Sequence, residues 1–418
     1  MFTPEVIAMT VLVFFALVGI HEWGHYYFAK RVGILVREFA LGFGPRLFSY
    51  KKGETRYTLR IFPIGGFVRM AGEDPEIVPV SPGQTIAVEV SDGVVRRIFL
   101  DRLEERTNAL RGAVQRIDLE RDLSLSLETD EGIRHFAVDP KAIMAARGSE
   151  TQIAPLNRQF AGKTAGQKAI TIFAGPMMNF VLSFVLFLVY VMGTGVPDYV
   201  KLAAIEENSP AAKAGLMPGD VITAVNGEPI GADMERLVAL IGASAGREMI
   251  FSVRRDGEDK LVPVKPETVD GTGKVGISIV MGLRKAGPLE AVGQSAALMW
   301  DFTKEIFFGL RMLLSLQLGL DDLGGPVRIV EVTGQVASMG VISLVLWSAM
   351  LSLYLGIFNL LPFPALDGSR LMFIGIEAIR GRPVDPARES MVHFIGFAML
   401  MMLMIAVTYN DILRLFKG

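Results

Sequence analysis

Apolar residues gather in four runs, each long enough to cross the hydrocarbon core of a membrane, which is roughly 30 Å thick. The runs cover residues 6–28, 169–192, 342–361 and 392–408. No basic segment precedes the first run and no small-residue cleavage site follows it, so we interpret it as a retained span and not as a signal peptide. The pattern predicts a polytopic α-helical membrane protein with four transmembrane helices.

Lysine and arginine residues flank these runs unevenly. They follow the first run, precede the second and fill the short loop between the third and the fourth: Lys30, Arg31, Arg37, Arg158, Lys163, Lys168, Arg380, Arg382 and Arg388. Because cytoplasmic loops carry an excess of basic residues, we expect these two loops in the cytoplasm. The N-terminus, the segment between the second and third runs and the C-terminal tail are then expected outside it.

Three stretches between the runs show other patterns. Period-two alternation at residues 55–62, between glycine-rich turns, is typical of a β-hairpin. Residues 73–166 are charged, with strand-like pieces, and are interpreted as a cytoplasmic β-rich insertion to which we assign no chemistry. Within the region 285–340, residues 291–320 carry apolar side chains at helical spacing, which favours an amphipathic helix lying in the membrane interface. A plain surface helix of the outside domain is the alternative.

The outside segment 196–284 has the turn signals of a small folded domain. Ser209 begins a short helix that Gly215 closes, and Asn226-Gly227 forms a hairpin turn after a strand. The strands and the longer helix are predicted at 221–225, 234–241, 249–254 and 261–264. This order resembles a PDZ domain, which would bind an extended peptide as an added strand. A spacer that acts as a steric gate is the alternative.

Composition narrows the possible chemistry. The chain is 51% hydrophobic and only 21% charged, which agrees with membrane spans joined by aqueous segments. Its net charge of −2 offers no basic field for nucleic acid. The chain has no Cys, which excludes disulfides, thiolate metal sites and thiol nucleophiles, so any metal must be held by His, Asp or Glu.

The first apolar run contains the motif His21-Glu22-Trp23-Gly24-His25. On a helix, His21 and His25 share one face, so two imidazole nitrogens can bind the same metal ion. Glu22 lies beside that face and is placed to accept a proton from an attacking water. Ionisable residues inside an apolar span are costly without a partner, and a metal ion would supply one.

A catalytic metal usually has three protein ligands. Phe28 and Arg31 stand where a metzincin would have Gly and His, so that pattern is excluded. Glu38 and Glu54 lie in the hairpin region and fit poorly, and His135 and His393 are weak candidates. The best candidate is Asp367, which follows two prolines that end the third run. A helix-capping role for Asp367 is the alternative.

These motifs together resemble the site-2 protease family of intramembrane zinc metalloproteases, in its bacterial regulator-of-sigma-E protease branch. The resemblance rests on HExxH in the first span, on Asn359-Leu360-Leu361-Pro362-Phe363-Pro364-Ala365-Leu366-Asp367-Gly368, and on the glycine-rich hairpin and the PDZ-like segment. It also covers Ala174-Gly175-Pro176-Met177-Met178-Asn179-Phe180 and Gly324-Gly325-Pro326-Val327. A single PDZ-like domain indicates a Gram-positive type of member. Ser369, where many members have Gly, is expected to affect local packing only.

The resemblance implies one zinc ion per chain, held by His21, His25 and Asp367, with Glu22 activating water. It implies substrate contacts at Asn359 and Pro362 and at the Gly65-Gly66 turn, which would pair with an unwound substrate. The implied substrates are single-span membrane proteins, such as anti-sigma factors, or signal-peptide remnants, first cut by a site-1-type protease. The implied location is the bacterial plasma membrane, with the active site toward the cytoplasm and the PDZ domain outside.

The expected organisation follows from these assignments. The first half consists of a first helix with HExxH (1–30), a membrane-associated β-hairpin region (31–72), the insertion (73–166) and a second helix (167–195). The second half consists of the PDZ domain (196–284), the amphipathic region (285–340), a third helix with NxxPxPxLDG (341–380) and a fourth helix (389–418). Two alternatives remain open. One is a non-catalytic PDZ-bearing membrane scaffold with a structural metal site, and the other is a metal transporter, although no inverted repeat is visible.

Overall fold

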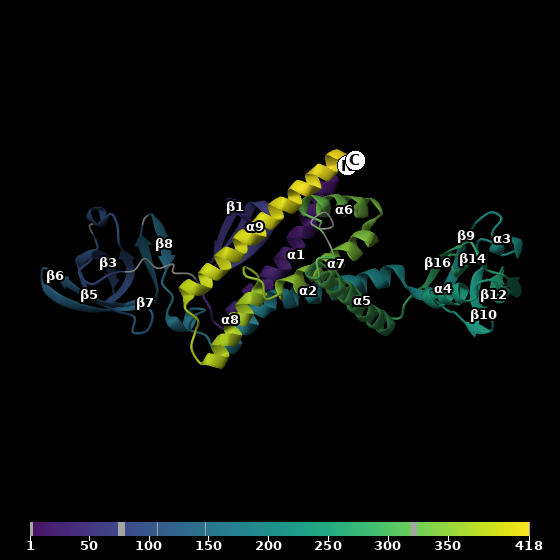
Figure 1. Ribbon diagram of the computed structural model, residues 1–418. Coiled ribbons are helices and arrows are strands. Elements are labelled where there is room, and N and C mark those ends of the chain that lie inside the picture. The colour runs from purple at the N-terminus through teal and green to yellow at the C-terminus, as the bar shows by residue number, and fades with distance from the viewer. Residues whose placement is uncertain are drawn as a thin grey trace. The chain divides into compact units, whose positions relative to one another are not determined.

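The computed structural model describes residues 3–73, 80–106, 108–146, 148–317, 319 and 324–417 (Figure 1). The chain divides into two units, formed by residues 1–183, 306–339 and 347–418 and by residues 184–305 and 340–346. Among the described helices, four are long and apolar enough to cross a membrane: α1 (Pro4–Arg31), α2 (Ala165–Thr194), α7 (Val341–Asn359) and α9 (Pro386–Lys417). The predicted number of candidate spans is confirmed.

The hairpin region consists of two long antiparallel strands, β1 (Val36–Lys52) and β2 (Thr55–Met70). Gly42 and Gly44 both have positive φ, a conformation that favours glycine, and β1 pairs irregularly around them. Leu41 of β1 pairs with Leu59 on one side and with Gly66 on the other, and both partners belong to β2. The strand β2 therefore bends around β1 and flanks it on both sides. Within the described chain no further strand pairs with β2, which leaves residues 66–70 at a sheet edge.

Residues 85–152 form the β-rich insertion. Its strands are β3 (Thr85–Ser91), β4 (Val94–Phe99), β5 (Leu110–Asp118), β6 (Ser124–Thr129), β7 (Gly132–Ala146) and β8 (Ser149–Gln152). They run in the order β4-β3-β5-β6-β7-β8, and a parallel pairing of β4 with β7 closes the sheet on itself. Inward-facing aliphatic side chains, among them Ile86, Ile98 and Leu127, fill this small barrel.

The base of the hairpin is tied to the chain that leaves the barrel. Arg37 donates a hydrogen bond to the carbonyl of Gln152, and the backbone N–H of Leu35 donates to the carbonyl of Arg158 in the short 3₁₀ helix η2 (Leu156–Arg158). Arg158 in turn binds both carboxylate oxygens of Glu54 at 2.7 and 2.8 Å. These bonds anchor the hairpin just before α2 begins.

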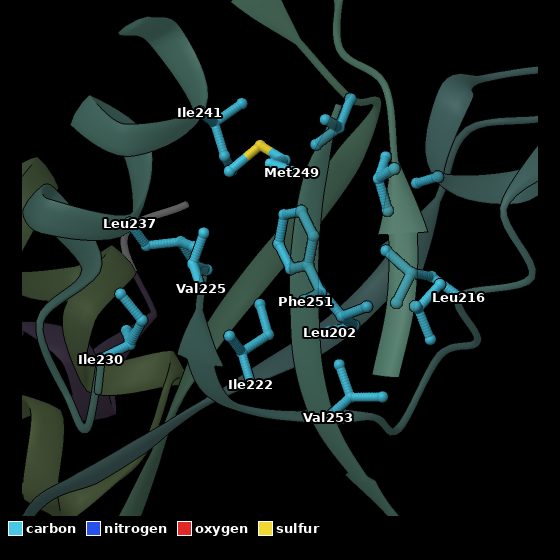
Figure 2. Packing of buried hydrophobic residues seen from close by; sticks show 14 of the residues in the cluster. Leu202, Leu216, Ile222, Val225, Ile230, Leu237, Ile241, Met249, Phe251 and Val253 are labelled. Atoms are coloured by element: carbon cyan, nitrogen blue, oxygen red, sulfur yellow. The ribbon is translucent and has the colours of Figure 1, made fainter. Parts of the chain in front are cut away.

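The segment 196–284 of the second unit contains two helices, a main sheet and a separate two-stranded sheet formed by β14 and β15. Its elements are β9 (Val196–Ile205), α3 (Pro210–Lys213), β10 (Val221–Val225), β11 (Glu228–Pro229), α4 (Met234–Ala243), β12 (Met249–Arg255), β13 (Glu258–Val264), β14 (Glu267–Val269), β15 (Thr272–Lys274) and β16 (Ile277–Arg284). The main sheet has the order β13-β12-β10-β9-β16, with β11 paired to β10. Figure 2 shows the side chains of Met249, Phe251 and Val225 pointing toward Leu237 and Ile241 of α4 in one core.

The local signals in this unit have the expected structural basis. The Ser209 hydroxyl accepts a hydrogen bond from the backbone N–H of Ala212, which caps α3, and Pro210 occupies the first helical turn. Asn226 and Gly227 both have positive φ between β10 and β11, as a tight hairpin turn requires.

The region 285–340 contains two helices, α5 (Pro288–Leu314) and α6 (Pro326–Ser338), where the sequence predicted one amphipathic helix. Pro326 begins α6, and the Asp411 carboxylate of α9 accepts hydrogen bonds from the backbone N–H groups of Gly325 and Arg328. Gly334 lies against Val6 of α1, where a Cβ would stand 2.6 Å from a Val6 methyl. Helix α6 is therefore fixed to both α1 and α9.

Residues 341–380 form α7 and a separate helix, α8 (Asp367–Arg380), joined by the proline-containing turn at 360–366. Gly368 lies against this turn, because a Cβ there would stand 2.3 Å from the carbonyl oxygens of Leu360 and Leu361. Ser369 is buried and donates a hydrogen bond to the carbonyl of Leu366. The turn thus places Asp367 at the start of α8.

Candidate metal centre

Three side chains converge in the first unit, from helices α1 and α8. His21 and His25 lie one turn apart on α1, and their Nε2 atoms are 3.2 Å from each other. Asp367 Oδ2, from the start of α8, lies 3.2 Å from His21 Nε2 and 3.3 Å from His25 Nε2. These three form the candidate metal-binding group found among the described residues.

The geometry of this group fits a zinc ion. Tetrahedral ligands at about 2.0–2.1 Å from zinc are roughly 3.3 Å from one another, which matches the three separations. His25 Nδ1 lies 2.9 Å from the Thr171 carbonyl, which can only accept, so Nδ1 carries the proton and Nε2 presents a lone pair. Asp367 Oδ2 is buried and has no hydrogen-bond partner among the described residues. A shared cation satisfies all three atoms at once.

Helix α2 provides a hydrogen-bond partner for the Nδ1 atom of each histidine. The side-chain amide of Asn179 lies 3.2 Å from His21 Nδ1, and Asn179 is completely buried. Partners of this kind orient a ligating imidazole and fix its tautomer. The two helices come close because of glycines: a Cβ at Gly175 would stand 2.2 Å from His25 Nε2, and one at Gly24 would stand 2.4 Å from a carbonyl of α2.

Glu22 shares a cavity with the candidate ligands. The cavity has a volume of about 540 Å³, and its lining includes His21, Glu22, His25, Asp367 and Asn359. The Glu22 side chain is buried, only 7% exposed. A carboxylate in this position is able to exchange a proton with a water that occupies the cavity.

One edge of the hairpin sheet also lines this cavity, through residues 66–70 of β2. Gly66 is the point of closest approach, because a Cβ there would stand 2.8 Å from Glu22 Cγ and 2.7 Å from the carbonyl oxygen of Ala40. The cavity therefore brings Gly66 and Asn359 together with the metal-binding group. Gly65 and Pro362 are not among the described residues that line it.

The structure also tests the capping role considered for Asp367 and the ligand roles considered for Glu38 and His135. Asp367 is the first residue of α8, the residue at the capping position is Leu366, and no side-chain capping bond is made there. Glu38 receives hydrogen bonds from Thr58 and Arg60, and His135 lies beside Ser126 in the barrel. Asp367 therefore does not cap α8 with its side chain, and Glu38 and His135 do not belong to the metal-binding group.

Glu54 also lies away from the metal-binding group. Hydrogen bonds from Arg158 and from Gln152 hold the pKa of the Glu54 carboxyl at about 2, below its usual value of 4.5. Glu54 is therefore a structural anion at the base of the hairpin.

Sequence reasoning missed several residues around the cavity. Arg370, three residues after Asp367, lines the cavity. Its guanidinium forms an ion pair with the Glu73 carboxylate at 2.8 Å. His393 of α9, which the sequence offered only as a weak ligand candidate, lines the cavity as well. The signal for Asn179 was present, since it lies in the Ala174–Phe180 stretch that carries part of the family resemblance. For Arg370 and Glu73 the sequence offered no signal, because the pairing is a tertiary contact.

Comparison with known proteins gives a consistent result over nearly the whole chain. Residues 9–403 match the model of peptidase family M50. The chain is 43% identical over 417 residues to zinc metalloprotease RasP of Oceanobacillus iheyensis, covering 97% of this chain and 98% of that protein. It is 42% identical over 423 residues to regulator of sigma-W protease RasP of Bacillus subtilis, covering 100% of both.

Among solved structures, the PDZ domain of an SdrC-like protein from Listeria monocytogenes is similar to 20% of this chain and is matched over 90% of its own length. The TM-score is 0.19 and the sequence identity 23%. The full-length matches confirm the resemblance to site-2 proteases. The chain belongs to peptidase family M50, and it is a membrane zinc metalloprotease with zinc as its cofactor.

Proposed function

We propose that this protein hydrolyses peptide bonds within transmembrane segments of single-span proteins. The observation that carries the proposal is the position of the chemistry: His21, Glu22 and His25 lie within the apolar helix α1, and Asp367 reaches the same cavity from α8. Charged and polar groups at such a position are costly in a membrane and mark a functional site.

In this proposal His21, His25 and Asp367 hold one zinc ion, and Glu22 is the general base. When bound, zinc would polarise the scissile carbonyl and lower the pKa of the attacking water. Glu22 takes a proton from that water and passes it to the leaving amine. The carbonyl of Thr171 and the amide of Asn179 keep the two imidazoles in place during the reaction.

The edge of β2 is proposed to bind the substrate. Helical carbonyls are hydrogen-bonded and shielded, so a transmembrane segment must unwind before it can be cut. The open edge at residues 66–70 lines the cavity and can pair with the unwound segment as an added strand. Asn359 lines the same cavity and supplies a side-chain amide to the substrate backbone. Gly65, with positive φ, precedes that edge within β2, and Pro362 lies in the turn between α7 and α8. We propose that each acts by shaping the backbone at its own position.

The hairpin and the flanking charges support a location in the bacterial plasma membrane. Large apolar side chains of the hairpin are exposed, including Leu47 at 64%, Phe48 at 63% and Phe62 at 54%. Such a surface is stable against lipid and unfavourable in water. With the basic loops in the cytoplasm, the active site opens toward the cytoplasmic side and the segment 196–284 lies outside.

We propose that the segment 196–284 is a PDZ domain that regulates access. Its helices and strands follow the order predicted for such a domain, and its sheet has two edge strands, β13 and β16. It would either bind a peptide at an edge or exclude substrates whose outer part is large. A relative named regulator of sigma-W protease supports anti-sigma factors as substrates. We propose that another protease makes the first cut.

The test uses Glu22→Gln, which keeps the size of the side chain and removes the base. We expect cleavage of a membrane-spanning reporter to fall by at least about 10²-fold while the purified variant retains its zinc. Undiminished cleavage would refute the mechanism. If the wild-type protein bound zinc but cut no transmembrane reporter at all, the scaffold alternative would replace this proposal.

A further inference from the structure

His393 of α9 makes a hydrogen bond beside the metal-binding group. Its Nδ1 accepts from the backbone N–H of Ala365 at 3.1 Å. Ala365 lies two residues before Asp367, and both Ala365 and His393 line the cavity of about 540 Å³. A residue of the fourth span therefore holds the turn that leads to the candidate ligand.

The turn is in a conformation that needs such support. Ala365 has φ +78°, a left-handed backbone that a residue with a Cβ adopts only at an energetic cost. Within the turn, the N–H groups of Phe363 and Leu366 bond to the carbonyls of Leu361 and Phe363. The Ala365 N–H points instead to His393, so that bond is made outside the turn.

A second contact between α9 and the turn lies one helical turn after His393. A Cβ at Gly396 would stand 2.2 Å from Pro364 Cβ and 2.6 Å from the Pro364 carbonyl oxygen. Only glycine allows α9 to approach the turn this closely. His393 and Gly396 thus hold the segment just before Asp367 from the same face of α9.

His393 is not suited to be a metal ligand. Its Nδ1 lone pair is used by the Ala365 N–H, so the proton of the neutral ring is on Nε2. Nε2 lies 3.8 Å from Glu389 Oε1 and has no hydrogen-bond partner among the described residues. The candidate metal-binding group of the described chain is His21, His25 and Asp367, without His393.

We propose that His393 is a positioning residue, which holds Ala365 in its left-handed conformation and thereby keeps Asp367 Oδ2 within ligand distance of the two histidines. This inference rests on the proposed role of Asp367 as a zinc ligand. The fourth span then contributes to metal binding without providing a ligand.

The test compares three substitutions in the full-length protein purified in detergent. His393→Leu removes the acceptor, His393→Asn keeps an oxygen on Cγ where the imidazole has Nδ1, and His393→Leu with Ala365→Gly removes the cost of positive φ. Zinc affinity is measured by competition with a chelator, and the visible spectrum of the Co²⁺-substituted protein reports the ligand geometry. His135→Leu, in the barrel, is the matched control.

We expect His393→Leu to weaken zinc binding about 10- to 100-fold and to alter the Co²⁺ spectrum. His393→Asn and the double variant should recover most of the affinity, and His135→Leu should equal the wild type. Unchanged zinc affinity and spectrum in His393→Leu would overturn the proposal. Failure of both rescuing variants would overturn it too, because a direct ligand or a packing role would be indicated.

Two further measurements keep the result interpretable. If His393→Leu does not fold, Gly396→Ala provides the second test, since its methyl group must push α9 from Pro364, and zinc affinity should again fall. Asp367→Asn separates the two claims. Retained zinc in Asp367→Asn contradicts the ligand assignment itself, whereas zinc lost there but kept in His393→Leu contradicts only the role of His393.

Discussion

Gly66 of β2 lies directly against Glu22 of α1, so close that a methyl group at Gly66 would stand 2.8 Å from Glu22 Cγ. The same methyl would stand 2.7 Å from the carbonyl oxygen of Ala40, in the neighbouring strand. Backbone atoms on one side and the proposed base on the other leave no space for a side chain. The sheet edge and the base are therefore fixed relative to each other.

Gly66→Ala is expected to reduce cleavage at least about tenfold without loss of zinc. Overpacking forces the neighbouring backbone or side chain to shift, and a small displacement of either the edge or Glu22 misaligns the attack. Reporter cleavage and zinc content are measured on the same preparation. Gly375→Ala is the matched control, because a Cβ at Gly375 meets no atom within 4 Å. Equal cleavage by the two variants would contradict the proposed contact.

Asn179→Leu should lower zinc affinity by about 10- to 100-fold. The substitution keeps a similar volume but removes the only side chain that an observed hydrogen bond links to His21 Nδ1 within the described chain. Competition with a chelator measures the effect. The hydrogen bond from Ser352 to the Asn179 carbonyl is a backbone contact and is retained, so unchanged affinity would mean that the amide does not position His21.

The ion pair between Glu54 and Arg158 predicts a pH dependence of stability. The carboxyl has a pKa of about 2 in the folded protein and an ordinary value near 4.5 when unfolded. Its contribution is therefore complete above pH 4.5 and is lost as the pH falls from 4.5 toward 2. Both side chains are about one quarter exposed, so we expect a contribution of about 1–2 kcal/mol.

Thermal unfolding in detergent, followed by tryptophan fluorescence between pH 7 and pH 3, tests this prediction. Glu54→Gln should lower the unfolding temperature at pH 7 and should differ less from the wild type at pH 3. A constant difference across that range would show that the carboxylate charge is not responsible.

The cap of α6 gives a prediction about stability. Asp411 is 5% exposed and accepts hydrogen bonds from the backbone N–H groups of Gly325 and Arg328. Loss of a helix cap costs about 0.5–2 kcal/mol, so Asp411→Ala should lower the unfolding temperature by about 1–2 °C in a chain of this size. Tyr409→Ala, at a residue that is 63% exposed, is the control and should have little effect. Equal effects of the two substitutions would contradict the capping role.

The local parts of the site could be predicted from the sequence. His21 and His25 are one helical turn apart, so their shared face follows from the helix period alone. Two prolines after Asn359 end α7, and this indicated that Asp367 begins a new element. Such signals are contained in a few consecutive residues.

The remaining contacts could not be predicted, because they join segments that are distant in sequence. The hydrogen bond from Ala365 to His393 depends on the left-handed backbone of Ala365. In a sequence, glycine usually indicates this conformation, and an alanine gives no sign of it. Helix α6 was missed because its N-terminus is capped from α9 by Asp411. The parallel pairing of β4 with β7 closes the barrel, and short alternating strands do not specify their neighbours.

Zinc content is the most direct test of the central claim that His21, His25 and Asp367 form the catalytic metal site. The purified protein should contain about one zinc ion per chain. Glu22→Gln should retain that zinc, whereas Asp367→Asn should lose it, because a neutral amide is a far weaker ligand than a carboxylate. An Asp367→Asn protein that holds as much zinc as the wild type would contradict the account.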